Sequence, residues 1–156
     1  MAGDEPSCRI ELYTGDRAEL AALFRLADDS EPAIAAYRER GDVLVAHDDA
    51  GAIIGHVQMI GPELKSLAVL EPWRGVGLGR ALARVGIAHA RGRGEPRIVV
   101  STAAADTRLL RFYQQLGFRL THIERDVFTP SAGYPADLHV DGIRILDRVW
   151  AALEVA

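Results

Sequence analysis

Apolar positions follow two periodicities along this chain: short apolar runs typical of strands, and spacings of three and four residues typical of helices. The runs predict strands at residues 8–12, 43–46, 52–60, 64–70, 98–101 and 118–128. The helical spacing predicts helices after Asp16, after Ser30, from Gly77 to Gly92 and from Asp106 to Gly117. A last strand is predicted within residues 140–153, with Trp150 packed inside.

Polar residues and glycines mark the ends of these elements. Asp16 and Glu19 form a pattern similar to a capping box, and Ser30 is placed to cap the second helix. Residues 48–51 predict a hairpin turn. The helix after Gly77 is expected to bury a stripe formed by Leu78, Ala81, Leu82 and Val85. Strands interleaved with helices predict one α/β (α+β type) domain over residues 1–156, a single mixed, mostly antiparallel sheet flanked by helices.

Composition and charge narrow the class of protein. The net charge of −4 gives an overall field that repels polyphosphates, so nucleic acid is a poor partner, although arginines cluster locally. The single Cys8 forms no internal disulfide and agrees with a reducing compartment. The chain shows neither a signal-peptide core nor an apolar run long enough to span a membrane. We therefore expect a cytoplasmic protein without membrane contact, and the near absence of lysine indicates a bacterial source.

The segment from Leu67 to Leu82 carries the clearest chemical signal, because an apolar strand runs through a glycine-rich turn directly into a helix. Glycine lets backbone approach a ligand closely, and the uncovered N–H groups and dipole at a helix start attract phosphate. A dinucleotide-binding loop requires glycine where Arg80 stands, and a Walker loop requires lysine after Gly79, where the chain has none. The remaining pattern is Arg-x-x-Gly-x-Gly, beginning at Arg74.

That loop and the Leu-Ala-Val before it resemble the acyl-CoA loop of the GNAT superfamily of N-acetyltransferases. Residues 106–118 resemble the family's second motif, a short helix that carries a tyrosine, here Tyr113, and closes on Gly-Phe. The two motifs stand in the family's order and at its distance, and the resemblance covers residues 7–128. It implies a GNAT fold with a splayed central strand pair, and acetyl-CoA as the acyl-donor substrate.

The resemblance also implies roles for individual residues. The backbone of Leu67, Ala68 and Val69 is expected to pair with the pantetheine arm of CoA, and the amide near Val69 to polarise the thioester oxygen. The pyrophosphate is expected to bind the main-chain N–H groups of Arg74, Gly75, Val76, Gly77, Leu78, Gly79 and Arg80. Tyr113 is expected to protonate the departing thiolate, because a phenol stays protonated at neutral pH. The Ser101 hydroxyl is a weaker alternative contact to pantetheine.

Two positions depart from the family pattern. The resemblance places Asp106 among the CoA-binding residues, at a position where the family most often has an asparagine, although its simplest role here is to cap the helix. Lys65 stands where many members have a glutamate that acts as base. The attacking amine must still lose a proton. Glu63 points the same way as Lys65 in a regular strand and is the preferred catalytic base, although the assignment stays open.

Other polar side chains receive no catalytic role. His122, Glu124 and Asp126 share one face of the predicted strand, and this stripe fits a cationic amine better than a metal, so no metal is predicted. Cys8 lies far in sequence from the loop and has no histidine neighbour to activate it. We therefore do not expect Cys8 to carry the acyl group.

The sequence thus predicts an acyl-CoA-dependent N-acyltransferase that moves acetyl from acetyl-CoA to a primary amine of a small molecule or peptide by direct attack. Two other functions stay open. One is a CoA-binding sensor or interaction module without turnover, and the other is a GNAT-type transferase that uses another acyl carrier, such as aminoacyl-tRNA. No pattern identifies the acceptor, and a homodimer is compatible with the sequence.

Overall fold

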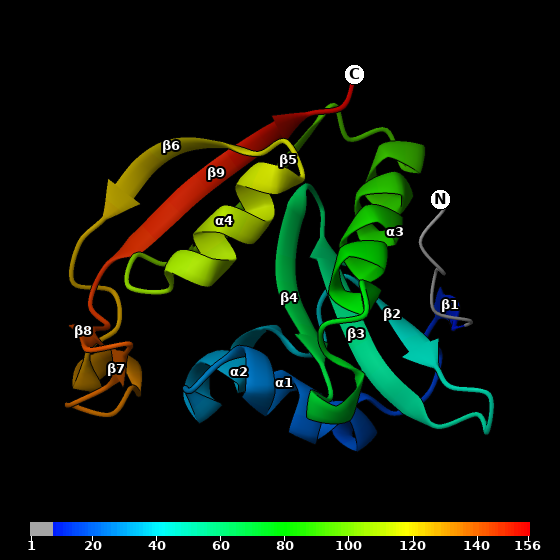
Figure 1. The fold of residues 1–156 in the computed structure, drawn as a ribbon, viewed down its shortest axis with the longest axis horizontal. Helices are drawn as coiled ribbons and strands as arrows, with labels where there is room; N and C mark the ends of the chain where they lie inside the picture. The colour runs from blue at the N-terminus through cyan, green and yellow to red at the C-terminus, as the bar shows by residue number, and fades with distance from the viewer. Residues whose placement is uncertain (1–7) are drawn as a thin grey trace.

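The computed structural model describes residues 8–156 and has one large sheet at its centre (Figure 1). The spatial order of its strands is β1 (Arg9–Leu12), β2 (Asp42–His47), β3 (Ile53–Ile60), β4 (Glu63–Val69), β5 (Arg97–Ala103), β9 (Arg148–Glu154) and β6 (Arg119–Glu124). Neighbouring strands are antiparallel except β4 and β5, which are parallel. The predicted mixed, mostly antiparallel sheet is confirmed.

Helices cover both faces of this sheet. The α-helices are α1 (Ala21–Ala27), α2 (Glu31–Tyr37), α3 (Leu78–Gly92) and α4 (Thr107–Gln115), and the 3-10 turns are η1 (Arg17–Leu20), η2 (Glu71–Trp73) and η3 (Pro130–Ala132). In β2, Leu44 packs with side chains of α3 and α4, whereas Val45 packs with those of α1 and α2. Successive strand side chains point to opposite faces, so the two helix pairs lie on opposite sides of the sheet. None of the helices in residues 8–156 is long and apolar enough to cross a membrane.

The first helical region begins differently from the prediction. Asp16 does cap it, since its carboxylate accepts from the Ala18 N–H at 2.9 Å, but the capped turn is η1 and α1 starts only at Ala21. Glu19 does not complete a capping box, because its carboxylate accepts the Tyr13 hydroxyl at 3.0 Å. Ser30 caps α2 as predicted, accepting from the Ala33 N–H at 3.2 Å.

Helix α3 rests on the sheet through small residues as well as large ones. Of the predicted stripe, Leu78 and Leu82 are fully buried, whereas Ala81 and Val85 are only half-buried. Gly86 is buried instead, and a Cβ at that position would lie 3.0 Å from Val57 of β3. The prediction from apolar spacing missed Gly86 because it considers only large apolar side chains. A residue without a side chain is what lets α3 approach β3 this closely.

The chain after α4 is more broken than predicted. β6 ends at Glu124, so the expected strand through residue 128 is wrong, and Asp126 follows it with a φ of 58°. The expected last strand is also divided, into the hairpin β7 (His139–Val140) and β8 (Ile143–Arg144) and then β9. Asp141 and Gly142 form the hairpin turn, both with positive φ, an Asp-Gly signal that apolar periodicity does not register. Trp150 is half-exposed on β9 and not packed inside.

The two parallel strands separate almost at once. β4 and β5 are in register only at Glu63 with Val99 and at Leu64 with Val100. Beyond these pairs β5 continues beside β9 along its whole length, from Arg97 to Ala103. The edge of β4 from residue 65 to 69 is therefore left without a neighbouring strand, as the predicted splay requires (Figure 1).

Candidate active site

A cavity of about 540 Å³ opens where β4 and β5 part. One part of its lining, which we call the β4 end, consists of Leu67, Ala68, Val69, Arg74, Asp106 and Tyr113. Another part, which we call the loop end, consists of Asp28, Asp29, Tyr37, Phe128, Tyr134, Leu138, Ile145 and Arg148. Ser101 also lines the cavity, whereas Glu63 and residues 75–80 are outside its lining.

The free edge of β4 presents backbone groups to this cavity. The Leu70 N–H donates to the Ile54 carbonyl of β3 at 2.9 Å. Because backbone groups of a strand alternate in direction, those of Val69 and Leu67 point away from β3, into the gap that β5 leaves. The Val69 carbonyl already accepts from Nε of Arg74 at 3.0 Å. The Val69 N–H therefore remains for a ligand, and the Arg74 side chain is held against this edge of β4, in the lining of the cavity.

The glycine loop continues from this edge. Gly75 and Gly77 have φ values of 79° and 86°, and a Cβ on either would meet no atom within 4 Å. The backbone N–H groups of residues 75–80 donate no hydrogen bond to any described residue. Leu78 itself is only 1% exposed, so the loop can offer a ligand its backbone but not this side chain. Open space beside a row of free N–H groups at the start of α3 is the geometry that binds phosphate.

Tyr113 projects from α4 into the β4 end of the cavity. Its ring packs edge-on against Phe112 and Phe118, with ring centres 5.1 and 5.7 Å away. Burial raises the pKa of the Tyr113 phenol above its ordinary value, and the charge of Asp106 raises it further. Asp106 caps α4 as predicted, accepting from the Leu109 N–H at 3.1 Å. The phenol is therefore a fixed donor that stays protonated at every physiological pH.

Glu63 lies at the closed end of the splay. Its carboxylate is 3.7 Å from Nζ of Lys65, whose ammonium also lies 4.8 Å from the ring centre of Tyr37. Burial alternates along β4, so Glu63 and Lys65 share the half-buried side of the strand, as the sequence predicted. Lys65 lines the cavity while Glu63 does not. Glu63, the preferred base, and Lys65, which departs from the family pattern, are thus partners in one ion pair.

The loop end is built from segments that are far apart in the chain. Asp28 follows α1, and its carboxylate accepts the hydroxyls of Tyr37 at 3.0 Å and Tyr134 at 2.8 Å. Ser30 donates to the Ala132 carbonyl at 3.0 Å, which fixes residues 130–134 against the α1–α2 junction. Sequence reasoning missed these side chains. No periodicity links residues so widely separated.

Comparison with known proteins decides the family. The chain matches the model of the Acetyltransferase (GNAT) family over residues 11–118. The chain belongs to the GNAT acetyltransferase family. It is 31% identical over 153 residues to YvbK, an uncharacterised N-acetyltransferase of Bacillus subtilis, across 94% of this chain and 96% of that protein. The family predicted from the sequence motifs is confirmed.

Solved GNAT structures share the whole fold. A GNAT family acetyltransferase from Elizabethkingia anophelis with acetyl-CoA bound has a TM-score of 0.87 at 27% identity, covering 97% of this chain and 99% of that chain. A Bacillus subtilis acetyltransferase in complex with CoA has a TM-score of 0.86 at 29% identity, covering 96% and 100%. The similarity therefore includes the strands and loops of the cavity as well as the two motifs.

The polar stripe predicted on one strand of this GNAT protein does not form as expected. His122 stacks on Trp150, with ring centres 6.0 Å apart, and Glu124 accepts the Trp150 indole N–H. Asp126 lies beyond the end of β6, so the three side chains do not share a strand face. Within residues 8–156 there is no group of three His, Cys, Asp or Glu side chains that could hold a metal.

Cys8 of the GNAT chain lies outside the lining of the cavity. Burial raises the pKa of its thiol, and the charges of Asp49 and Asp48 raise it further. A thiol with a raised pKa has less of the nucleophilic thiolate at neutral pH.

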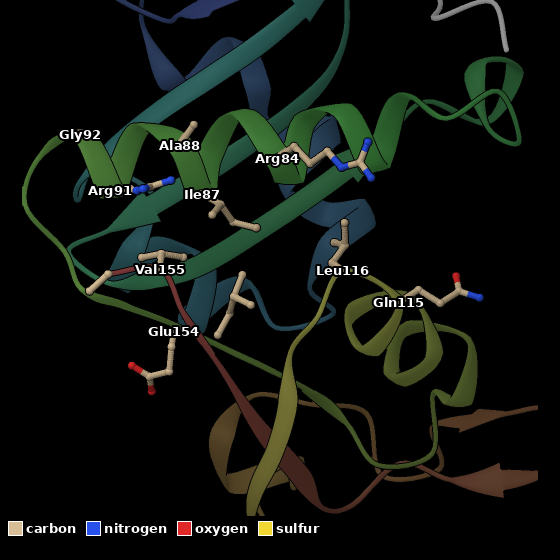
Figure 2. A pocket seen from close by; sticks show the side chains of 11 residues that line it. Arg84, Ile87, Ala88, Arg91, Gly92, Gln115, Leu116, Glu154 and Val155 are labelled. Atoms are coloured by element: carbon tan, nitrogen blue, oxygen red, sulfur yellow. The ribbon is translucent and has the colours of Figure 1, made fainter. Parts of the chain in front are cut away.

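A second hollow, of about 760 Å³, lies between α3, the end of α4 and the last residues of the chain (Figure 2). Figure 2 shows that Arg84, Ile87 and Arg91 come from α3, and Leu116 and Val155 from the opposite walls. The cavity between β4 and β5, in contrast, is lined by Asp29 and three tyrosines, and burial raises the pKa of each of these four groups. Catalytic sites concentrate such groups, so the smaller cavity is the better candidate for the GNAT active site.

Proposed function

We propose that this GNAT protein is an acyl-CoA-dependent N-acyltransferase that transfers acetyl from acetyl-CoA to a primary amine. The observation that carries the proposal is the free edge of β4 leading into a loop of unpaired N–H groups, with Tyr113 facing the same cavity. The Elizabethkingia anophelis and Bacillus subtilis relatives with acetyl-CoA and CoA bound support acetyl-CoA as the donor.

The placement of these groups supports a direct transfer. The pantetheine arm pairs with the backbone of Leu67 and Val69, and its pyrophosphate accepts the N–H groups of residues 75–80. The amine nitrogen attacks the thioester carbon, while the Val69 N–H stabilises the charge that develops on the oxygen. When the C–S bond breaks, the Tyr113 phenol protonates the CoA thiolate, and the amine's proton leaves to a base. The products are the acetylated amine, which is an amide, and CoA with a free thiol.

The loop can be tested by a matched pair of glycine substitutions. Gly77 and Gly51 have nearly equal φ values, 86° and 84°, and a Cβ added to either would meet no atom within 4 Å. Valine at either position therefore brings the same backbone strain, but only Gly77→Val fills the space beside the phosphate-binding N–H groups. We expect Gly77→Val to weaken acetyl-CoA binding by about tenfold or more, measured by calorimetry, and Gly51→Val to leave it unchanged. Equal effects of the two variants would show that the loop does not bind the donor.

For the catalytic base we propose Glu63, because its carboxylate pairs with Lys65, which does line the cavity. Since Glu63 itself is outside the lining, it would accept the proton through water. We expect Glu63→Gln to lower kcat about tenfold, because the attacking amine then lacks its proton acceptor. Glu95→Gln, on the loop before β5, is the control and should leave kcat unchanged. A kcat of Glu63→Gln no lower than that of Glu95→Gln would rule out Glu63 as the base.

The decisive assay for the activity is release of CoA thiol from acetyl-CoA over a panel of primary amines. Turnover with at least one amine is the expected result. Thermal stabilisation by acetyl-CoA without release of thiol would instead indicate a CoA-binding module without turnover. Absence of both would indicate another acyl carrier.

A further inference from the structure

We propose that the acceptor of this protein is an apolar amino acid that binds at the loop end of the cavity. Its amine donates to the carboxylate of Asp28, and its carboxylate accepts from the guanidinium of Arg148. The inference rests on the proposed N-acetyltransferase function and specifies its substrate class. It follows from three observations on the walls of the loop end.

The first observation is that Asp28 is held in one orientation. Its Oδ1 accepts from the Tyr134 hydroxyl at 2.8 Å and from the Ser30 N–H at 3.1 Å, and its Oδ2 accepts from the Tyr37 hydroxyl at 3.0 Å. Burial raises the pKa of both phenols, and the charge of Asp28 raises it further, so both stay donors. A carboxylate offers about four lone-pair positions. Asp28 therefore keeps capacity for one more donor from the cavity, which an amine supplies.

The second observation is a cation, Arg148, in the same loop end. The Arg148 guanidinium lies 5.5 Å from the ring centre of Phe128 and 5.7 Å from that of Trp150, and its side chain is 22% exposed. Its ion pair with Glu124 is long at 3.7 Å, so the fork of N–H groups is not saturated. Arginine resting on aromatic rings presents a planar edge that binds a carboxylate through two parallel hydrogen bonds.

The third observation concerns the apolar side chains in the same part of the lining. The loop end is lined by the side chains of Phe128, Leu138 and Ile145, together with the ring of Tyr134. An apolar side chain of the acceptor would be taken out of water there. A polyamine fits less well, because it offers no carboxylate to Arg148 in the lining of the cavity. An amine, a carboxylate and an apolar side chain on one small molecule describe an apolar amino acid.

The test compares L-phenylalanine with L-phenylalaninamide, which has the same shape but lacks the carboxylate charge. Acetylation of each is measured by CoA release in the wild type and in Arg148→Gln. We expect kcat/KM for phenylalanine to fall by about ten- to a hundredfold in Arg148→Gln, while kcat/KM for the amide stays within about twofold. Because each ratio compares two enzymes on one substrate, the different basicities of the two amines cancel. The matched control is Arg119→Gln on exposed β6, which should leave kcat/KM unchanged for both substrates.

The outcomes separate this inference from the proposed function. If spermidine or other amines are acetylated but phenylalanine is not, the N-acetyltransferase function stands and the amino acid assignment is overturned. Equal losses on phenylalanine and its amide in Arg148→Gln would also overturn it, because they would indicate a role in folding. If no amine releases CoA thiol, the proposed function itself fails. A selective loss on phenylalanine supports the assignment.

Discussion

Replacing Tyr113 with phenylalanine is expected to lower kcat by about a hundred- to a thousandfold, since a positioned general acid contributes that much to many enzymes. Without the phenol, the CoA thiolate must leave unprotonated from a buried site, where charge is costly. The Kd for acetyl-CoA should change little, because the hydroxyl acts only when the C–S bond breaks. The measurements are single-turnover release of CoA thiol and calorimetric binding of acetyl-CoA.

The Tyr113→Phe result can be separated from a loss of folding. The phenylalanine ring keeps the packing against Phe112 and Phe118, so the free energy of unfolding should change by less than about 1 kcal/mol. Tyr13→Phe is the matched control: it removes an exposed hydroxyl that bonds Asp16 and Glu19, outside the cavity lining. If kcat of Tyr113→Phe fell no further than that of Tyr13→Phe, the phenol would have no acid role.

Replacing Phe24 with alanine is expected to reduce the free energy of unfolding by about 3 to 5 kcal/mol, the usual cost of truncating a fully buried aromatic side chain. Phe24 is completely buried, and its ring lies 4.6 Å from the ring of His56 and 6.2 Å from that of Tyr37, measured between centres. It therefore joins α1 to both β3 and α2. Urea denaturation at pH 7 measures the loss, and Phe112→Ala, a half-buried ring on α4, is the control.

The same substitution should change the pH dependence of stability. Burial lowers the pKa of His56 from 6.5 to about 3 in the folded protein. Between these values the unfolded chain binds a proton that the folded chain does not, so stability is lost as pH falls below about 6.5, by up to about 1.4 kcal/mol per pH unit. The cavity left by Phe24→Ala admits water to His56 and should make this slope shallower. Identical slopes between pH 7 and pH 5 in wild type and variant would contradict this account.

The parts of the site that the sequence predicted are those encoded within a few consecutive residues. The glycine loop and the Asp106 cap depend on backbone geometry set by neighbours in sequence, and Tyr113 was placed by its family motif. The loop end was not predicted, because Asp28 and Tyr134 meet only after the sheet has formed.

The burial of Trp150 was predicted wrongly for a related reason. Its apolar character indicated burial, but β9 pairs there with the exposed strand β6, so its ring is covered by His122 and the Arg148 guanidinium.

The separation of β4 from β5 also bears on how the two halves of the molecule hold together. The sheet divides into an antiparallel half, β1 to β4, and a second antiparallel half formed by β5, β9 and β6, and strand pairing joins them only at Glu63 and Leu64. If the pantetheine arm lies in the gap as proposed, its amide groups take the place of a strand there. Binding and release of the donor would then couple and uncouple the motions of the two halves.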